Sequence, residues 1–168
     1  KRGIDFDVVF FNMAPLDEFG NLKRQVESSL RPDRVYYYFN SHHGDDYYAM
    51  AKSYASLCSS ISDHLANHYY DFVLIAGDRI EQLAVASVAH LMYVPVGHIQ
   101  AGELSGNIDG ITRHAIGRLA KVHFAANTDA ERRLINSGEE LNRIYLTGAP
   151  QLDDLFSYED TYTDLLKP

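Results

Sequence analysis

The 168-residue sequence predicts a single α/β domain with a doubly wound, Rossmann-like parallel sheet. Two observations support this fold class. Short apolar runs alternate with longer amphipathic segments along the whole chain, as strands and helices do in βαβ units. The apolar runs are nearly continuous, which is typical of parallel strands with helices on both faces. We therefore assign residues 1–168 to one domain.

The expected strands are the runs rich in β-branched and aromatic residues. Six are predicted, with boundaries good to about two to four residues, near residues 7–11, 34–39, 72–76, 95–99, 122–125 and 143–147. The segments between them predict helices in "LKRQVESSL", "DDYYAMAKSYASLCSSISDHLANHY", "RIEQLAVASVAHLM", "ITRHAIGRLA" and "DAERRLINSG". Gly138 ends the last of these, because glycine is favoured just after a helix.

The first expected strand begins almost at the start of the sequence. The run "IDFDVVF" fits the second strand of a doubly wound domain better than the first. The first strand of such a domain is central. A chain without it should show either a gap beside residues 7–11 or a closed-up sheet, and we expect the sequence to be a fragment.

Composition excludes several classes of function. The formal charge of −8 argues against a nucleic-acid-binding protein, which normally has a basic face. The longest apolar run, "LAVASVAHLMYVPV", is too short to span a membrane. Neither G-x-G-x-x-G nor a Walker motif is present, which weakens dinucleotide and nucleoside-triphosphate binding as functions. Cys58 is the single cysteine and cannot form an intrachain disulfide, so we expect a cytoplasmic protein.

Two strands are followed by polar side chains. "FVLIAGDRIEQ" places Asp78 and Arg79 at a strand-to-helix turn, and "VGHIQAGELSGNID" places His98, Gln100 and Glu103 one strand later. Ligands of open α/β sheets bind at the carboxyl ends of the strands. If the two strands are neighbours, Asp78, His98, Gln100 and Glu103 converge on one crevice.

Simpler explanations exist for several of these residues. Asp109 and Arg113 are four residues apart and share a helix face, but Asp109 also fits an N-cap. Asp78 fits a turn, since aspartate after glycine is common there. Glu103 fits either support of a site or a solvated loop, and His98 fits a hydrogen bond to neighbouring backbone.

Two further histidines, His64 and His68, have the i, i+4 spacing of metal ligands on a helix. No third ligand lies near them by motif, so a solvated helix face is favoured and no metal is expected.

The segment "GDRIEQLAVASVAHLMYVPVGHIQAGELSGNIDGITRHAIGRLAKVHFAANTDAERRLINSG" resembles the hydrolysing UDP-N-acetylglucosamine 2-epimerases. The pattern G-D-R, then H-I-x-x-G-E, then I-D-x-x-x-R-H-A-I carries the resemblance, which extends from "FDVVFF" to "TGAPQLDDL". The resemblance implies two Rossmann-like domains in a GT-B-like arrangement, with the active site between them. This chain would be the N-terminal domain without its first strand, and residues 150–168 would begin the connection to the second domain.

The resemblance also implies a reaction and a set of roles. Such enzymes remove the C2 proton of a UDP-N-acetylhexosamine and expel UDP; water then adds to give N-acetylmannosamine or a related sugar for sialic or nonulosonic acid synthesis. The motif positions imply catalytic roles for Asp78, Asp109 and Glu103. They imply substrate-binding roles for His98, Gln100, Arg79, Arg113 and His114. No cofactor or metal is implied, the partner is a UDP-sugar, and the protein is expected to form a homo-oligomer.

Two positions depart from the family pattern. Gln100 stands where many relatives carry glutamate, and Ala14 stands where relatives usually carry histidine. Two alternatives therefore stay open: a catalytically silent homologue that binds a nucleotide sugar, and the N-terminal half of a GT-B glycosyltransferase. The spaced motif set argues against the second.

Overall fold

A computed structural model describes residues 3–11, 26, 28, 32–38, 46–106 and 108–153. All six expected strands are present within one residue of their predicted bounds. The helix expected in residues 22–30 falls mostly outside the described residues. The elements are β1 (Asp7–Phe11), β2 (Arg34–Tyr38), α2 (Tyr47–Asn67), β3 (Val73–Ala76), α3 (Ile80–Leu91), β4 (Val96–Ile99), α4 (Ile108–Leu119), β5 (Val122–Ala125), α5 (Thr128–Asn136), the short 3₁₀ helix η2 (Leu141–Arg143), β6 (Ile144–Leu146) and the 3₁₀ helix η3 (Pro150–Leu152).

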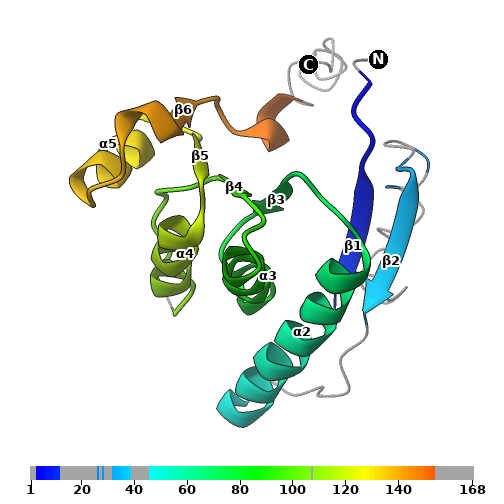
Figure 1. Cartoon of the computed structure of the whole chain (residues 1–168). Coiled ribbons are helices and arrows are strands. Elements are labelled where there is room, and N and C mark those ends of the chain that lie inside the picture. The colour runs from blue at the N-terminus through cyan, green and yellow to red at the C-terminus, as the bar shows by residue number, and fades with distance from the viewer. Residues whose placement is uncertain are drawn as a thin grey trace, which may run out of the picture.

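The strands form two parallel sheets (Figure 1). β1 pairs with β2, and a second sheet has the order β3-β4-β5-β6. Each strand of the second sheet pairs with the next one in sequence, as repeated βα units produce. Of the two arrangements expected beside residues 7–11, the structure has the open one, because β1 does not join the four-stranded sheet.

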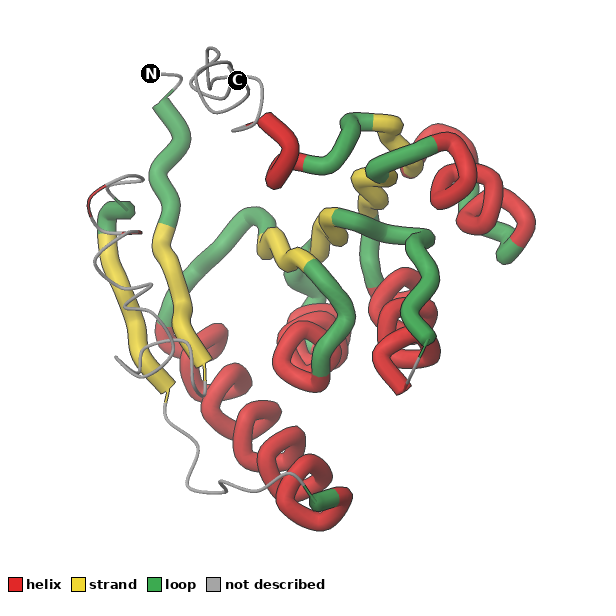
Figure 2. Tube along the Cα trace, turned by 180° about the vertical axis from the view of Figure 1, so that it is seen from behind, coloured by secondary structure: helices red, strands yellow, loops and turns green. Residues whose placement is uncertain are grey.

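Helices α3, α4 and α5 pack on one face of the four-stranded sheet (Figure 2). Ile75 and Val96 meet Ile116 of α4 in one buried cluster, and Ala125 meets Leu134 of α5 in another. The strand register puts these strand residues on a single face. The side chains of the opposite face are more open, and its large hydrophobic residues Leu74 and Tyr145 are exposed.

The long helix α2 begins after Asp46, whose carboxylate accepts a hydrogen bond from the amide nitrogen of Ala49 at 2.8 Å. Its buried stripe recurs at helical spacing: Ala49, Ser53, Leu57, Ile61 and His64. The stripe attaches the helix to the rest of the domain through Leu57 and Ile61, which lie against α3 side chains.

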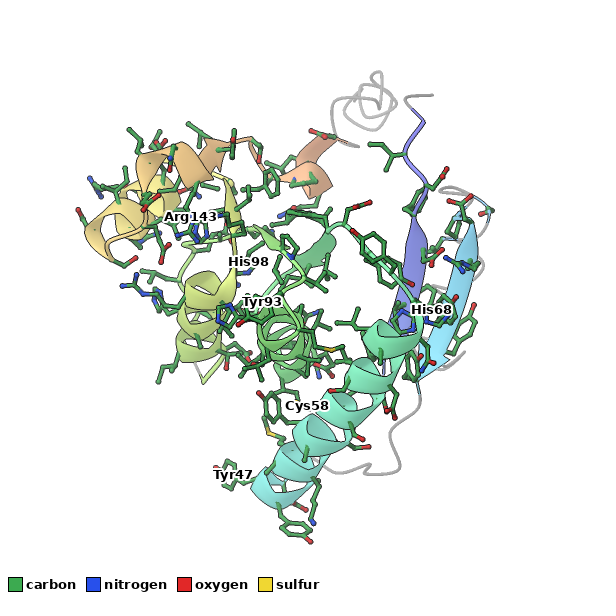
Figure 3. All side chains as sticks on the ribbon, in the orientation of Figure 1. Tyr47, Cys58, His68, Tyr93, His98 and Arg143 are labelled. Carbon is green, nitrogen blue, oxygen red and sulfur yellow. The ribbon has the colours of Figure 1, made fainter. Side chains whose placement is uncertain are left out.

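The prediction that His64 lies on a solvated face is wrong. His64 is buried where α2 crosses the two-stranded sheet, and His68 lies beside it (Figure 3). Nδ1 of His64 contacts the Tyr38 hydroxyl at 2.9 Å, and Nε2 contacts the Tyr70 hydroxyl at 2.9 Å. Tyr70 donates its own proton to Asp7 at 2.7 Å. Burial lowers the pKa of His64, so this chain of hydrogen bonds contains a neutral imidazole.

Candidate active site

The carboxyl ends of β3 and β4 are adjacent, as the sequence predicted, because the two strands pair in parallel with Ile75 opposite His98. His98 is fully buried, and its Nε2 lies 2.7 Å from the carbonyl oxygen of Gly77. A carbonyl can only accept, so Nε2 carries the proton. Burial lowers the pKa of His98 to about 4, and the ring is therefore neutral at pH 7.

The sequence offered two roles for His98, a hydrogen bond to neighbouring backbone or a place in the binding site, and the structure contains the backbone hydrogen bond. Figure 3 shows the residue inside the domain, among the strands and helices of the larger sheet. Its second ring nitrogen, Nδ1, is buried without a hydrogen-bond partner. The imidazole supports the turn after β3 through the Gly77 carbonyl, and its substrate-binding role stays a prediction.

Arg113 of α4 joins the polar residues of the two strand ends. Its NH1 donates to the carbonyl oxygen of Gln100 at 2.9 Å and to Oε2 of Glu103 at 3.3 Å. Its NH2 donates to Oδ2 of Asp78 and to Oγ of Ser105, the latter at 3.3 Å. The side chain of Arg113 is only 9% exposed. A buried guanidinium needs such partners, and its planar fork can hold several acceptors at once.

Asp78 is held as a carboxylate by this arrangement. Ser105 Oγ donates to Asp78 Oδ2 at 2.5 Å, and Arg113 NH2 donates to the same oxygen. Burial alone would raise the pKa of Asp78, but the hydrogen bonds from Ser105 and Arg113 and the positive charge of Arg113 outweigh it. The pKa therefore lies below the usual aspartate value, and Asp78 is ionised at neutral pH.

The loop after β4 has a constrained backbone. Gln100 has a φ of 60°, a left-handed conformation that is uncommon for residues other than glycine. Gly102 has a φ of 78°, and a Cβ there would lie 2.4 Å from the carbonyl oxygen of Ala130 in α5. Arg133 NH1 donates to the carbonyl oxygen of Gly102 at 3.1 Å. The loop is thus held from both sides, by Arg113 of α4 and by α5.

Three predicted site residues lie elsewhere on this framework. α4 begins at Ile108, earlier than the sequence indicated, so Asp109 lies inside the first turn and not at the cap. A carboxylate in a first turn is favoured by the helix dipole. Arg79 precedes α3, is largely exposed and pairs with Glu81 at 3.4 Å. His114 is exposed and faces a groove of about 360 Å³ between α4 and α5, so neither Arg79 nor His114 joins the Arg113 cluster.

A family model described as UDP-N-acetylglucosamine 2-epimerase matches residues 4–167. The chain belongs to this epimerase family. It is 37% identical over 117 residues to a UDP-N,N'-diacetylbacillosamine 2-epimerase (hydrolyzing) of Legionella pneumophila, covering 70% of this chain and 31% of the relative. It is 32% identical over 154 residues to a UDP-N-acetylglucosamine 2-epimerase of Neisseria meningitidis, covering 92% of this chain and 40% of the relative.

Solved structures of UDP-N-acetylglucosamine 2-epimerases have the same fold. A Neisseria meningitidis enzyme bound to UDP-GlcNAc matches with a TM-score of 0.73 and 22% identity, over 92% of this chain and 49% of that one. A Methanocaldococcus jannaschii enzyme matches with a TM-score of 0.71 and 19% identity, over 91% and 48%. Both are two-domain, GT-B-like proteins, and this epimerase chain spans about half of each.

The sequence analysis did not single out Ser105, a polar residue of the candidate site that contacts Asp78 and Arg113. It belongs to no motif in "GELSGNID", and the signal that was available is its position between Glu103 and Asp109 in a loop with two other site residues. Ala14 lies outside the described residues. Within residues 3–11, 32–38, 46–106 and 108–153, no cluster of three or more histidine, cysteine, aspartate or glutamate side chains could hold a metal. In the same ranges, no helix is long and apolar enough to cross a membrane.

Proposed function

We propose that the full-length protein is a hydrolysing 2-epimerase of a UDP-N-acetylhexosamine, releasing UDP and an N-acetylmannosamine-type sugar. The observation that carries the proposal is the convergence of Asp78, Glu103 and the Gln100 backbone on Arg113 at the carboxyl ends of β3 and β4. Two relatives above 30% identity are named as hydrolyzing 2-epimerases, which supports the same reaction class. A homo-oligomer, a cytoplasmic location and a role in sialic or nonulosonic acid synthesis belong to this proposal.

The proposed chemistry assigns a different task to each carboxylate. A base takes the proton from C2 of the sugar while the bond from C1 to the UDP oxygen breaks, which leaves a 2-acetamidoglucal and UDP. Water then adds, with hydroxyl at C1 and a proton at the opposite face of C2. An ionised Asp78 can accept the C2 proton, and it then holds that proton on the face of the sugar from which it was taken, so it cannot deliver the proton that enters from the opposite face. The second step therefore falls to Glu103 or Asp109, and Gln100 can orient the sugar but not transfer a proton.

The test uses the full-length protein in D₂O. With UDP-N-acetylglucosamine or a UDP-diacetamido sugar, we expect free UDP and a free sugar that carries deuterium at C2. Formation of an epimerised UDP-sugar without free UDP would show that the reaction is not hydrolytic. This chain spans only part of the relatives' length, and we expect the 168-residue chain alone to give no turnover.

Variants test the assigned roles. We expect Asp78→Asn and Asp109→Asn each to lower kcat by about 10²–10⁴-fold, the usual cost of losing a proton-transfer group, with little change in KM. Asp71→Asn, an exposed aspartate just before β3, is the matched control and should keep native turnover. If Asp109→Asn keeps native kcat and only loses thermal stability, Asp109 serves the helix and not the reaction.

One observation favours a second candidate, a silent homologue that binds the nucleotide sugar without turning it over. Gln100 cannot take up or release a proton at neutral pH, whereas the family resemblance implies a glutamate at this position in many of these enzymes. For an active enzyme, Gln100→Ala should cost about tenfold or less, as for one neutral hydrogen bond, and Gln100→Glu should be tolerated. A native protein without turnover that gains activity in Gln100→Glu would favour the silent homologue.

A further inference from the structure

Ser105 lies in the loop between β4 and α4 and contacts both charged partners of the buried pair. Its hydroxyl donates to Oδ2 of Asp78 at 2.5 Å and accepts from NH2 of Arg113 at 3.3 Å. Arg113 NH2 also donates to the same oxygen of Asp78. The three groups form a closed triangle of hydrogen bonds through the Ser105 hydroxyl, Oδ2 of Asp78 and NH2 of Arg113, whereas the buried Nε of Arg113 has no partner among the described residues.

The directions of these hydrogen bonds depend on the protonation of Asp78. Arg113 stays charged and can only donate, and the serine hydroxyl has a single proton. If Asp78 were protonated on Oδ2, the added proton would face the protons that Ser105 and Arg113 already donate to that oxygen, and it would have no acceptor. Among the described residues, the side-chain hydrogen bonds from Ser105 and Arg113 both end on Oδ2. The triangle is therefore compatible with the carboxylate and directs proton transfer to Oδ1.

We propose that Ser105 is a positioning residue that holds Asp78 ionised and turned so that Oδ1 takes the substrate proton. This inference rests on the proposed function, because it needs Asp78 to act as a base. Ser105 itself does not exchange a proton with the sugar. Other charged or titratable groups also face Asp78 or lie beside it: Arg113 from α4, His98 from β4, Glu103 from the loop, and the Arg79–Glu81 pair at the start of α3.

The test compares Ser105→Ala with Ser105→Thr in the full-length protein. A charge-assisted hydrogen bond contributes enough to shift the pKa of a carboxylate by about one to two units. Losing the donor raises the pKa of Asp78, so in Ser105→Ala the acid limb of the kcat profile should move up by about one to two pH units. Misplacing the base should also lower kcat about ten- to a hundredfold at pH 7, with KM changed less than about threefold.

Ser105→Thr keeps the hydroxyl and should restore most of kcat and the native acid limb. Ser62→Ala, which removes a hydroxyl that donates to a carbonyl of α2, is the control for a general loss of stability and should match the native profile. A loss of rate that resides in KM, an unmoved acid limb, or a threonine variant that behaves like alanine would each overturn the inference.

A native protein without turnover would defeat the proposed function first. The inference is then read from the carboxyl ¹³C shift of Asp78, followed against pH in the native protein and in Ser105→Ala. A higher titration midpoint in Ser105→Ala supports the ionising role of Ser105 even in an inactive protein. Equal midpoints contradict it.

Discussion

Acid should destabilise the folded chain through His98. The unfolded imidazole titrates near its ordinary pKa of 6.5, whereas the buried ring titrates at about 4. The folded protein therefore binds fewer protons between these values, and its stability is fully present above about pH 6.5 and is lost as pH falls toward 4. From these two pKa values, we expect His98 to cost about 2 kcal/mol of unfolding free energy between pH 7 and pH 5.

Urea denaturation measures this loss directly. For an m-value of about 2 kcal/mol/M, the midpoint should fall by about 1 M between pH 7 and pH 5. His98→Gln keeps a donor toward the Gly77 carbonyl but cannot titrate, so its midpoint should fall by less. The exposed His114→Gln is the control and should keep the native dependence. Burial also lowers the pKa of His64 and His123, so only the difference between variants belongs to His98. An equal fall in the native protein and His98→Gln would refute the reasoning.

Three further predictions concern stability and are read from urea or thermal denaturation. Gly102→Ala should destabilise the folded chain by more than about 2 kcal/mol, because the new Cβ would meet a backbone carbonyl of α5 and the residue has a positive φ. Gly117→Ala should stabilise the folded chain by about 1 kcal/mol, because Gly117 lies inside α4 and a Cβ there would have no neighbour within 4 Å. Equal effects of the two alanines would contradict this. Glu139→Gln should lower the free energy of unfolding by about 2 kcal/mol, because the side chain is 5% exposed and pairs with two arginines and a histidine. Glu140→Gln, at an exposed position, is the control and should leave that free energy unchanged. Arg113→Lys should destabilise by about 2 kcal/mol, because an ammonium cannot hold the acceptors that the guanidinium fork holds. A lysine variant as stable as the native protein would rule out that role.

The strands and the place of the site could be predicted because both depend on local pattern. Apolar runs of four or five residues mark the strands, and parallel strands put their carboxyl ends together. Asp78, Glu103 and the backbone carbonyl of Gln100 therefore meet at Arg113 near the two strand ends, whereas His98, the fourth residue expected there, is buried against the Gly77 carbonyl. The start of α4 was placed too late, because "GNID" contains no clear break between loop and helix.

The partners of individual side chains could not be predicted in the same way. The partner of Ser105 is 27 residues away in sequence, and that of His64 in β2 is 26 residues away. Helical spacing of His64 and His68 indicates a shared helix face but not whether that face is solvated. His64 is buried because a two-stranded sheet crosses α2 there, and this arrangement depends on tertiary packing.

Because the strands form two separate sheets, the domain should unfold locally in one sheet before the other. β1 and β2 exchange backbone hydrogen bonds with each other, while in the described part of the chain their attachment to α2 runs through side chains, among them the Tyr38–His64–Tyr70–Asp7 series. Units held by few cooperative backbone links open at lower free energy than the global transition. The amides of β1 and β2 should therefore exchange with deuterium through a subglobal unfolding event, while those of β4 and β5, enclosed between neighbouring strands, exchange only when the whole domain unfolds.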